Sequence, residues 1–546
     1  LSTFLPRDFH DAVALDPDTA SVDLAELRAE VRALVGKETA KLERYAGELR
    51  ASRAGAGASG VDALLIGRTL EAVEEARGDL QRLLDFVLRE DGQLVFSETM
   101  KYAGFAFRRS VAARTLLLRH TPTLTGVPHA LDPAQDHRLA PPRHIIDYGR
   151  NAYLQFQESE AHAPKHLVDH PLLAACARAM AATLQGEAAP NALLFSSAMG
   201  AIDSLIDYMG ARARSAGAMN LIGQRCWFEI RQYVDESWPE AFRTIDERDA
   251  GALDAAIEDP AVFGVMVELV ANHPDMSVID LGRVVRKIGA TRFERPKLIV
   301  FDVVHTPDVP VFERWFAGAM PANLCVALVV SGVKFMQAGW DISKSGLLLF
   351  RCDEAAFGQQ DRTLLQKLVE IRSVSGRAPS IEEACLADLE TPASFASRLA
   401  RYDRNTCYFA RALDAWLREN RLGHVCSPWL AEHPGHEVAM NVYGAGGRVL
   451  FLYFDPARIG QAALGGLFKE LAASAADEGL SLMAAPSFGL AAPHVHVVIR
   501  SGMTSSLRVS TGSTSMRATE ELLQFFMRQL GRFIERSPPV LPAASG

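Results

Sequence analysis

Several features that mark large classes of protein are missing from this sequence. The longest apolar runs, such as Leu324–Val330, fall far short of the ~20 residues that a membrane-spanning helix needs. The first residues, LSTFLPRDFHDAV, contain neither the basic region nor the apolar core of a signal peptide. We therefore expect a cytoplasmic protein without a membrane partner.

Clustered positive charge is also missing. The chain has 57 Lys and Arg against 66 Asp and Glu, for a net charge of −9, so nucleic acid and anionic membranes are not expected partners. The seven cysteines are scattered and form no CxxC pair. We expect reduced structural thiols and no metal site.

The length of 546 residues suits two or three domains. Apolar residues at three- and four-residue spacing predict helices at 23–49 and 61–89, which the turn-prone segment ASRAGAGASG would join into a hairpin. We expect this hairpin to pack on the main domain or on another subunit rather than to act as a separate binding module. The expected parts are an N-terminal helical extension with a linking arm (1–143), a large domain (144–372) and a small C-terminal domain (373–546).

From about Leu172 the pattern alternates between helix and strand. This alternation predicts an α/β fold with a mainly parallel sheet and helices on both faces, in which ligands bind at the carboxyl ends of the strands. The predicted strands are 192–195, 219–222, 263–270, 298–304, 324–330 and 347–350.

After Arg372 the order of elements becomes mixed, as in a small α+β domain. The predicted elements are a long helix from Pro392, a β-hairpin of 437–443 and 448–454 around GAGG, a helix near 459–478, strands in HVHVVI and LRVS, and a last helix from Thr519.

Two residues at predicted strand ends suggest a cofactor. Lys334 follows the apolar run Leu324–Val330, and Asp302 lies in the apolar run of 298–304. A buried carboxylate without a cationic partner is costly. An aldehyde cofactor with a basic ring nitrogen would satisfy both residues, with Lys334 bonded to the aldehyde and Asp302 on the nitrogen. Pyridoxal 5'-phosphate (PLP) is such a cofactor.

Short motifs surround these residues in a specific order. They read FSSAMGAI at 195–202, ELVANHP at 268–274, DVVHTP at 302–307, SGVKFMQAGWDISKSG at 331–346, SFG at 487–489 and LRVSTG at 507–512. In this order they resemble the Cys/Met metabolism family of PLP enzymes, the cystathionine γ-synthase and γ-lyase group of fold type I, over roughly residues 145–535. The resemblance implies a seven-stranded sheet and a small C-terminal domain, to which this chain adds its N-terminal hairpin.

The lysine motif carries the strongest part of the resemblance. The family pattern S-x-T-K-Y-x-x-G-H-S-D-x-x-x-G is matched in register at Ser331, Lys334 and Asp341, and Gly339 and Gly346 each stand one position after the family's glycines. Val333 replaces Thr and Phe335 replaces Tyr. The resemblance implies that Lys334 forms the Schiff base with PLP and that Ser331 contributes a hydroxyl to the phosphate.

Other motifs imply the rest of the cofactor site. The resemblance places the phosphate at the turn of Ser197, Ala198 and Met199, the pyridine nitrogen on Asp302, and the 3-oxygen on Asn272. Taken alone, Ser197 could simply cap a helix, and Asn272 could simply belong to a turn.

Aromatic residues follow the second predicted strand, where the family has a tyrosine that stacks on the ring. Trp227 is our first choice for this stacking and Phe228 the second, although neither carries a phenol proton and either could belong to the core. His305 has no family counterpart. It either lines the pocket or is an ordinary loop histidine, and we favour the second reading.

Arg508 is the residue that the resemblance assigns to the α-carboxylate of an amino-acid substrate, with Ser487 assisting. Tyr148 and Arg150 match a family motif through which a neighbouring subunit reaches the phosphate. That match implies a homodimer or homotetramer.

The resemblance implies elimination or replacement at the γ or β carbon of an α-amino acid. Two alternatives stay open. One is a PLP enzyme of other α-carbon chemistry, such as amino transfer, decarboxylation or aldol cleavage. The other is a non-catalytic partner protein with a PLP-enzyme fold.

Overall fold

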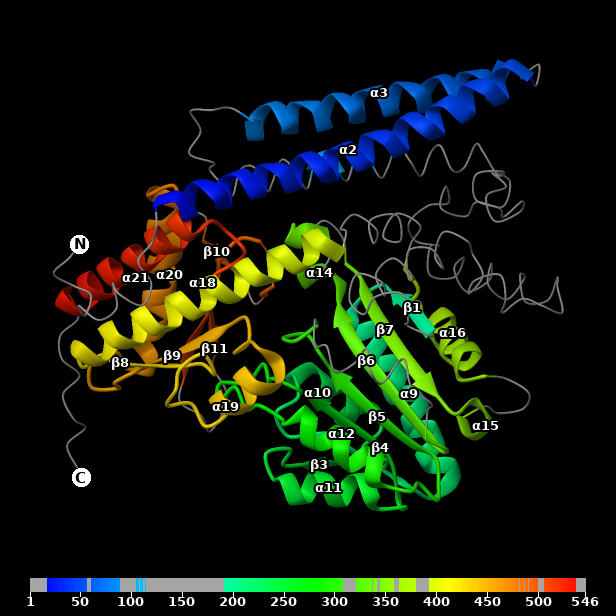
Figure 1. The fold of residues 1–546 in the computed structure, drawn as a ribbon, viewed down its shortest axis with the longest axis vertical. Helices are drawn as coiled ribbons and strands as arrows, with labels where there is room; N and C mark the ends of the chain where they lie inside the picture. Colours follow the sequence, from blue (N-terminus) through cyan, green and yellow to red (C-terminus); the bar gives the residue numbers. More distant parts are fainter. Residues whose placement is uncertain are drawn as a thin grey trace.

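Figure 1 shows the chain as a computed structural model. The residues that it describes are 17–55, 60–88, 105–107, 109–110, 113, 191–307, 321–335, 337–340, 344–357, 363–379, 392–480, 482–485, 487–489, 491–498 and 505–536.

A seven-stranded sheet lies in the middle of the part of the chain between residues 191 and 379 (Figure 1). Its order is β1-β7-β6-β5-β4-β2-β3; neighbours among β2 to β6 are parallel, whereas β7 is antiparallel to both β1 and β6. The expected α/β fold with a mainly parallel sheet is confirmed. The strands are β1 Asn191–Phe195, β2 Met219–Gly223, β3 Phe242–Ile245, β4 Val262–Glu268, β5 Lys297–Asp302, β6 Leu324–Ser331 and β7 Gly346–Cys352.

Strand β3 was not predicted from the sequence. Only its first and last residues, Phe242 and Ile245, are buried, and the two residues between them are exposed. A four-residue segment with this pattern at the edge of a sheet shows neither the alternation of a half-buried strand nor the apolar run of a central one.

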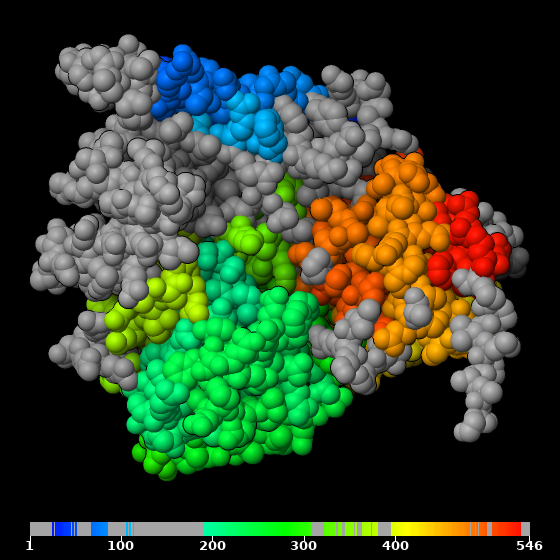
Figure 2. Space-filling model, turned by 180° about the vertical axis from the view of Figure 1, so that it is seen from behind, coloured from blue at the N-terminus to red at the C-terminus, as the bar shows by residue number. Residues whose placement is uncertain are grey.

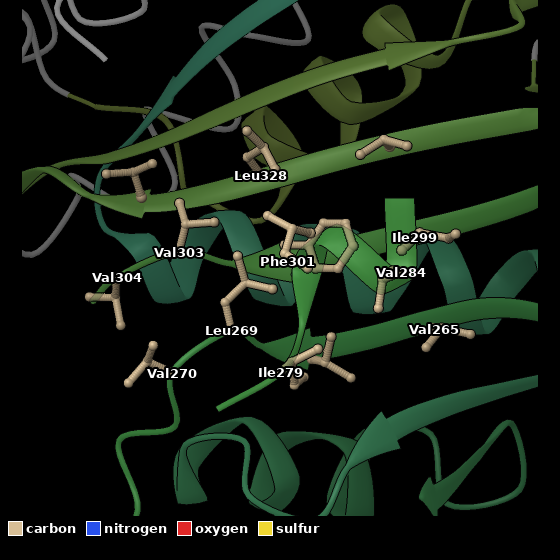
Figure 3. Packing of buried hydrophobic residues seen from close by; sticks show 14 of the residues in the cluster. Val265, Leu269, Val270, Ile279, Val284, Ile299, Phe301, Val303, Val304 and Leu328 are labelled. Atoms are coloured by element: carbon tan, nitrogen blue, oxygen red, sulfur yellow. The ribbon is translucent and has the colours of Figure 1, made fainter. Parts of the chain in front are cut away.

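The central strands read as continuous apolar runs because both faces of the sheet are covered. On β5, Ile299 and Phe301 pack into one core, and Leu298 and Val300 pack into the core on the opposite face. Figure 3 shows the first of these cores, where Phe301 lies among Val303, Leu269 and Val284.

Helices from the same part of the chain cover the two faces. One core contains residues of α9 Ala198–Ala216, α10 Phe228–Ser237 and α16 Leu364–Val374, and the other contains residues of α11 Ala250–Glu258 and α12 Leu281–Ala290. Shorter helices lie near the carboxyl end of β6 and after β7. They are α14 Gly332–Phe335, the 3-10 turn η4 Gln337–Gly339 and α15 Glu354–Phe357.

A five-stranded sheet follows, with the order β10-β11-β12-β9-β8. Its neighbours are antiparallel except for the pair β10 and β11, and its core is filled by three long helices. Figure 2 shows this part, in orange and red, beside the green part that contains the larger sheet. The elements are α18 Pro392–Glu419, β8 Gly423–Cys426, β9 Leu450–Phe454, α20 Gln461–Asp477, β10 Met483–Ala484, β11 His494–Val498, β12 Ser506–Ser510 and α21 Met516–Arg536.

The predicted β-hairpin around GAGG is wrong in its first half. Residues 436–438 form the helical turn α19 His436–Val438, and the π-helix η5 Ala439–Tyr443 follows directly. Strand β9 pairs with β8 and β12 instead. Val438, Met440 and Val442 stand at every second position, as in a strand, but the segment is helical. The Tyr443 hydroxyl donates to the carbonyl of Ile279 beside the larger sheet.

The N-terminal hairpin is confirmed as two long helices, α2 Pro17–Gly55 and α3 Gly60–Leu88. Both helices carry buried residues, such as Val31 of α2 and Leu80 of α3, and Arg77 of α3 pairs with Glu43 of α2 at 2.8 Å. One end of α2 lies beside α21 (Figure 1). Among the described helices, none is both long enough and apolar enough to cross a membrane.

Candidate active site

Polar residues gather at one edge of the larger sheet, where parallel strands have their carboxyl ends. β4 ends in Glu268, β5 in Asp302 and β6 in Ser331, and Glu268 and Asp302 are register partners on neighbouring strands. Lys334 follows β6 in the short helix α14. The crevice outside the carboxyl ends of such strands is the usual ligand site in α/β folds.

Lys334 and Asp302 influence each other at this edge. Burial lowers the pKa of Lys334 from 10.5 to about 8, opposed by the negative charges of Asp302 and Glu268 and reinforced by Arg508. Burial also raises the pKa of Asp302, whereas Lys334 and the backbone N–H of Val304, 2.9 Å from the carboxylate, lower it. The amine and the carboxyl can therefore both exchange protons near neutral pH.

Glu268 joins two loops that carry other candidate residues. Its carboxylate accepts the backbone N–H of Trp227 at 2.8 Å and that of Asn272 at 2.7 Å. The side chain is fully buried, and burial together with the neighbouring Asp302 raises its pKa from 4.5 to about 8. Two carboxyl groups so close in a dry site do not both ionise readily, so Glu268 is mostly protonated when Asp302 carries its charge.

Arg508, buried in the middle of β12, reaches this edge from the smaller sheet. Its Nη1 donates to Oδ1 of Asn272 at 3.0 Å. Its guanidinium carbon lies 5.6 Å from the ring centre of Trp227 and 5.5 Å from that of Phe488. The structure therefore brings Arg508, Asn272 and Trp227 together, whereas Phe228 is exposed.

Phe488 is the residue that sequence reasoning missed. Its ring stacks on His305 at 4.4 Å and 5°, and Nζ of Lys334 lies 4.0 Å from its centre. The only available signal was the mismatch of SFG with the family's S-L-G. Ser487, next to it, is partly exposed, and its predicted role in carboxylate binding stays a prediction.

His305 is buried beside these residues. Its Nδ1 accepts the backbone N–H of Arg448 at 3.4 Å, and its carbonyl accepts Nη1 of Arg448 at 2.6 Å. Burial and the nearby Lys334 hold the pKa of His305 well below its usual value. Within the described part of the chain, its Nε2 has no hydrogen-bond partner. A neutral ring that uses Nδ1 as an acceptor carries its proton on Nε2. The Nε2–H group of His305 is therefore a donor for which no described residue supplies an acceptor.

The N-terminus of α9 lies at the same edge. Ser197 caps this helix, because its hydroxyl accepts the backbone N–H of Gly200 at 2.9 Å, and the amides of Ala198 and Met199 begin the first turn. Gly346 faces both this turn and Ser331. A Cβ on Gly346 would lie 2.3 Å from the carbonyl of Ser197 and 2.4 Å from the nitrogen of Ala198, so only glycine permits this close approach.

Tyr148, Arg150 and Asp341 lie outside the described residues. Their predicted roles stay predictions. In the described part of the chain, no group of three or more His, Cys, Asp or Glu side chains is placed to hold a metal ion.

No protein-family model and no curated protein matches the sequence of this chain. Solved structures do match. The cystathionine gamma synthase from Xanthomonas oryzae pv. oryzae, in complex with cystathionine, has a TM-score of 0.51 and 19% identity, over 66% of this chain and 87% of that one. The cystathionine gamma-lyase from Lactobacillus plantarum, complexed with L-serine, has a TM-score of 0.51 and 17% identity, over 67% and 87%.

This chain has the cystathionine γ-synthase fold. The fold type I architecture that the motif order implied is confirmed. About a third of the chain lies outside the likeness, since the comparison covers 66% of it. In the cystathionine γ-synthase fold of this chain, Arg508 of β12 contacts Asn272 and Phe488 contacts Lys334 at the edge where β4, β5 and β6 end.

Proposed function

We propose that this chain is a PLP-dependent enzyme that catalyses elimination or replacement at the γ or β carbon of an α-amino acid. The observation that carries the proposal is the convergence of Lys334, Asp302 and Arg508 at one strand edge, from three separate segments of the chain. The lysine amine and the buried carboxyl suit the aldehyde and the ring nitrogen of PLP, and the buried guanidinium suits the carboxylate of an amino acid.

The residues at this edge fit PLP in charge and in hydrogen bonding. The orphaned Nε2 of His305 supplies a donor, Asp302 supplies a buried partner for a protonated ring nitrogen, and the turn that Gly346 leaves open at Ser197 offers helix amides to a phosphate. We propose that Lys334, Asp302, Asn272, His305, Ser331, Ser197, Ala198 and Met199 hold the cofactor, and that Trp227 rather than Phe228 stacks on it, with Tyr148 and Arg150 of a neighbouring copy as further phosphate contacts.

When bound, PLP withdraws electrons from the α-carbon of the substrate and stabilises negative charge there. Lys334 then carries protons between the substrate carbons, since a pKa of about 8 lets its amine both accept and return a proton near neutral pH. Asp302, when ionised, holds a proton on a ring nitrogen. Arg508, held by Asn272, binds the α-carboxylate with Ser487 assisting, and its planar fork matches the two oxygens.

Burial excludes water from these residues, which strengthens each charge interaction. The buried ring of Phe488 lies against both Lys334 and His305. Any loss of a leaving group from the γ carbon requires protons to be removed at two carbons in turn, and a flexible lysine next to an apolar ring is suited to this task.

The test is incubation of the purified protein with PLP and amino acids that carry a thiol, an ester or a halide at the β or γ carbon. Elimination releases the leaving group together with a keto acid and ammonia after hydrolysis. Replacement forms a new bond to an added thiol as the leaving group departs. We expect one of these outcomes, and Asp302→Asn protein should lose it by orders of magnitude, because a charged partner in a dry site is worth several kcal/mol.

Other products would favour the rivals. Transfer of the amino group to an added keto acid, release of carbon dioxide or cleavage of the side chain as an aldehyde would indicate other α-carbon chemistry. No turnover of any amino acid by PLP-loaded protein would indicate a non-catalytic partner. We further propose that the protein is a cytoplasmic homodimer or homotetramer divided at residues 143 and 372, which sedimentation and limited proteolysis can test.

A further inference from the structure

Helix α18 connects the N-terminal hairpin to two walls of the Lys334 site. Three consecutive residues, Arg401, Tyr402 and Asp403, point to three different partners, because neighbours on a helix are turned by about 100°. Figure 1 shows α18 running below the hairpin, with β8, β9 and β11 of the smaller sheet below it.

Arg401 binds the N-terminal hairpin. Its two terminal nitrogens donate to the two oxygens of Glu30 on α2, at 2.8 and 2.6 Å. The Arg401 side chain is only 5% exposed and that of Glu30 16%. A bidentate pair of this kind fixes orientation as well as distance. Breaking it leaves the buried charge of Arg401 with the more distant and half-exposed carboxylate of Glu26, at 3.8 Å, which is a weaker partner.

Tyr402 and Asp403 face the site. The Tyr402 hydroxyl accepts the backbone N–H of Gly489 at 3.0 Å, next to Phe488, and also bonds Ser510 of β12. Asp403 pairs with Arg448 at 2.9 Å, and Arg448 in turn holds the carbonyl of His305 at 2.6 Å. The position of α18 therefore sets both rings that lie beside Lys334.

A second connection reaches the loop after Lys334 directly. The ring of Phe107 lies 5.3 Å from that of Trp340, and Phe107 is fully buried. Its neighbours are tied to the hairpin, because Ser110 donates to Glu38 of α2 at 2.6 Å and Arg109 pairs with Asp79 of α3 at 2.8 Å. Figure 2 shows this short segment, in cyan, against the blue helices.

The loop that Phe107 contacts is strained. Gln337 and Ala338 have φ values of 60° and 57°, in the left-handed region that residues other than glycine rarely adopt. Such a backbone persists only where its surroundings fix it. Gln337 donates to Ser345 at 3.0 Å, the N–H of Ala491 donates to Gly339 at 2.8 Å, and Trp340 packs on Phe107.

We propose that the N-terminal hairpin is a positioning element of the Lys334 site, acting through the Glu30–Arg401 ion pair and the Phe107–Trp340 contact. The hairpin fixes α18 on one side and the strained loop on the other, and both must be in place for Lys334, Phe488 and His305 to keep their arrangement. This inference rests on the proposed function, because bound PLP is the reporter.

The first test reverses the buried ion pair in the full-length protein loaded with PLP. Glu30→Arg and Arg401→Glu should each speed cofactor release by roughly tenfold or more, within the range usual for coupling between distant sites. They should also shift the pH midpoint of the cofactor's absorbance change. The double variant Glu30→Arg with Arg401→Glu restores the pair and should recover most of both properties. The matched control is Glu71→Arg, the same charge change at an exposed position of the same hairpin.

The second test uses a milder substitution, in case the proteins with a reversed charge do not fold. Phe107→Leu should speed cofactor release and shift the same pH midpoint while the protein stays folded. Phe105→Leu is its control, since Phe105 is 45% exposed and lies two residues away.

Three results are decisive. Faster release in the single variants with recovery in the double variant supports the inference, as does a Phe107 effect that Phe105 does not share. Release and pH midpoint equal to wild type in Glu30→Arg and Phe107→Leu overturn it, while the proposed function stands. Wild-type protein that binds no PLP overturns the proposed function, and the inference with it.

Discussion

Burial sets the protonation of the residues around Lys334. It lowers the pKa of the amine and raises those of both neighbouring carboxyls. Of the two carboxyls, Glu268 has the stronger shift and accepts two backbone N–H groups. Glu268 therefore acts by holding the loops of Trp227 and Asn272, and the negative charge at the site belongs to Asp302.

The raised pKa of Glu268 makes the stability of the cofactor-free protein depend on pH. A carboxyl whose pKa rises from 4.5 to about 8 on folding stabilises the fold at low pH and loses that contribution as pH rises through this window. Glu268→Gln should remove this decrease in the free energy of unfolding, which is on the order of a few kcal/mol. Urea midpoints at pH 5, 6.5 and 8 for both proteins give the difference, in which the contributions of buried histidines cancel.

The control for this comparison is Glu236→Gln, since Glu236 is exposed on α10. The stabilities of the wild-type protein and of Glu268→Gln could instead change in parallel with pH. That result would show that folding does not raise the pKa of Glu268.

Arg508→Lys tests the carboxylate site. The variant keeps the charge but loses the planar fork, so amino-acid binding should weaken by roughly tenfold or more, whereas cofactor binding should stay unchanged. Spectral titration with an amino acid and with its decarboxylated amine measures the preference for the carboxylate. Equal discrimination by the two proteins would mean that Arg508 has only a structural role. Arg517→Lys, on the exposed side of α21, is the control.

At the scale of elements, the phosphate turn depends on the contact between β7 and the start of α9. Gly346→Ala would push the Cβ into the backbone of Ser197 and Ala198. We expect a loss of about 1–3 kcal/mol in stability and a larger loss of affinity for PLP, measured by thermal melting and by cofactor titration.

Gly289→Ala is the matched control for that substitution, because no atom lies within 4 Å of a Cβ at Gly289 of α12. Cofactor affinity that survives in Gly346→Ala protein would place the phosphate elsewhere.

The site residues at the strand ends were predictable because each one stands in or close to an apolar run in the sequence. Asp302 lies within an apolar run and Lys334 follows another by four residues, and parallel strands bring such ends together. The ring of Phe488 was not predictable, since its contacts with His305 and Lys334 join segments more than 150 residues apart. The π-helix at Ala439–Tyr443 was missed because short alternating segments do not show whether tertiary packing will make them strands or helices.

At the scale of the whole molecule, the site is built from two sheets and one helix. The larger sheet supplies Glu268 and Asp302, the short helix α14 after β6 supplies Lys334, and β12 of the smaller sheet supplies Arg508. Helix α18 contacts the loop of Phe488 through the bond between Tyr402 and Gly489. The same helix binds the N-terminal hairpin through the pair of Arg401 and Glu30. A site assembled from such distant segments requires that the two sheets keep one relative position, which the hydrogen bond from the buried Arg448 to the carbonyl of His305 helps to maintain.

The central claim is that Lys334 bonds PLP covalently, and borohydride reduction followed by peptide mass analysis tests it most directly. Reduction of the PLP-loaded protein should place one pyridoxyl phosphate on the peptide that contains Lys334. The yield should rise as pH passes the pKa of about 8, because only the neutral amine attacks the aldehyde. Lys344→Ala is the control, since Lys344 is exposed and should not alter the result. A Lys334→Ala protein that still retains reducible, covalently held PLP would contradict the account.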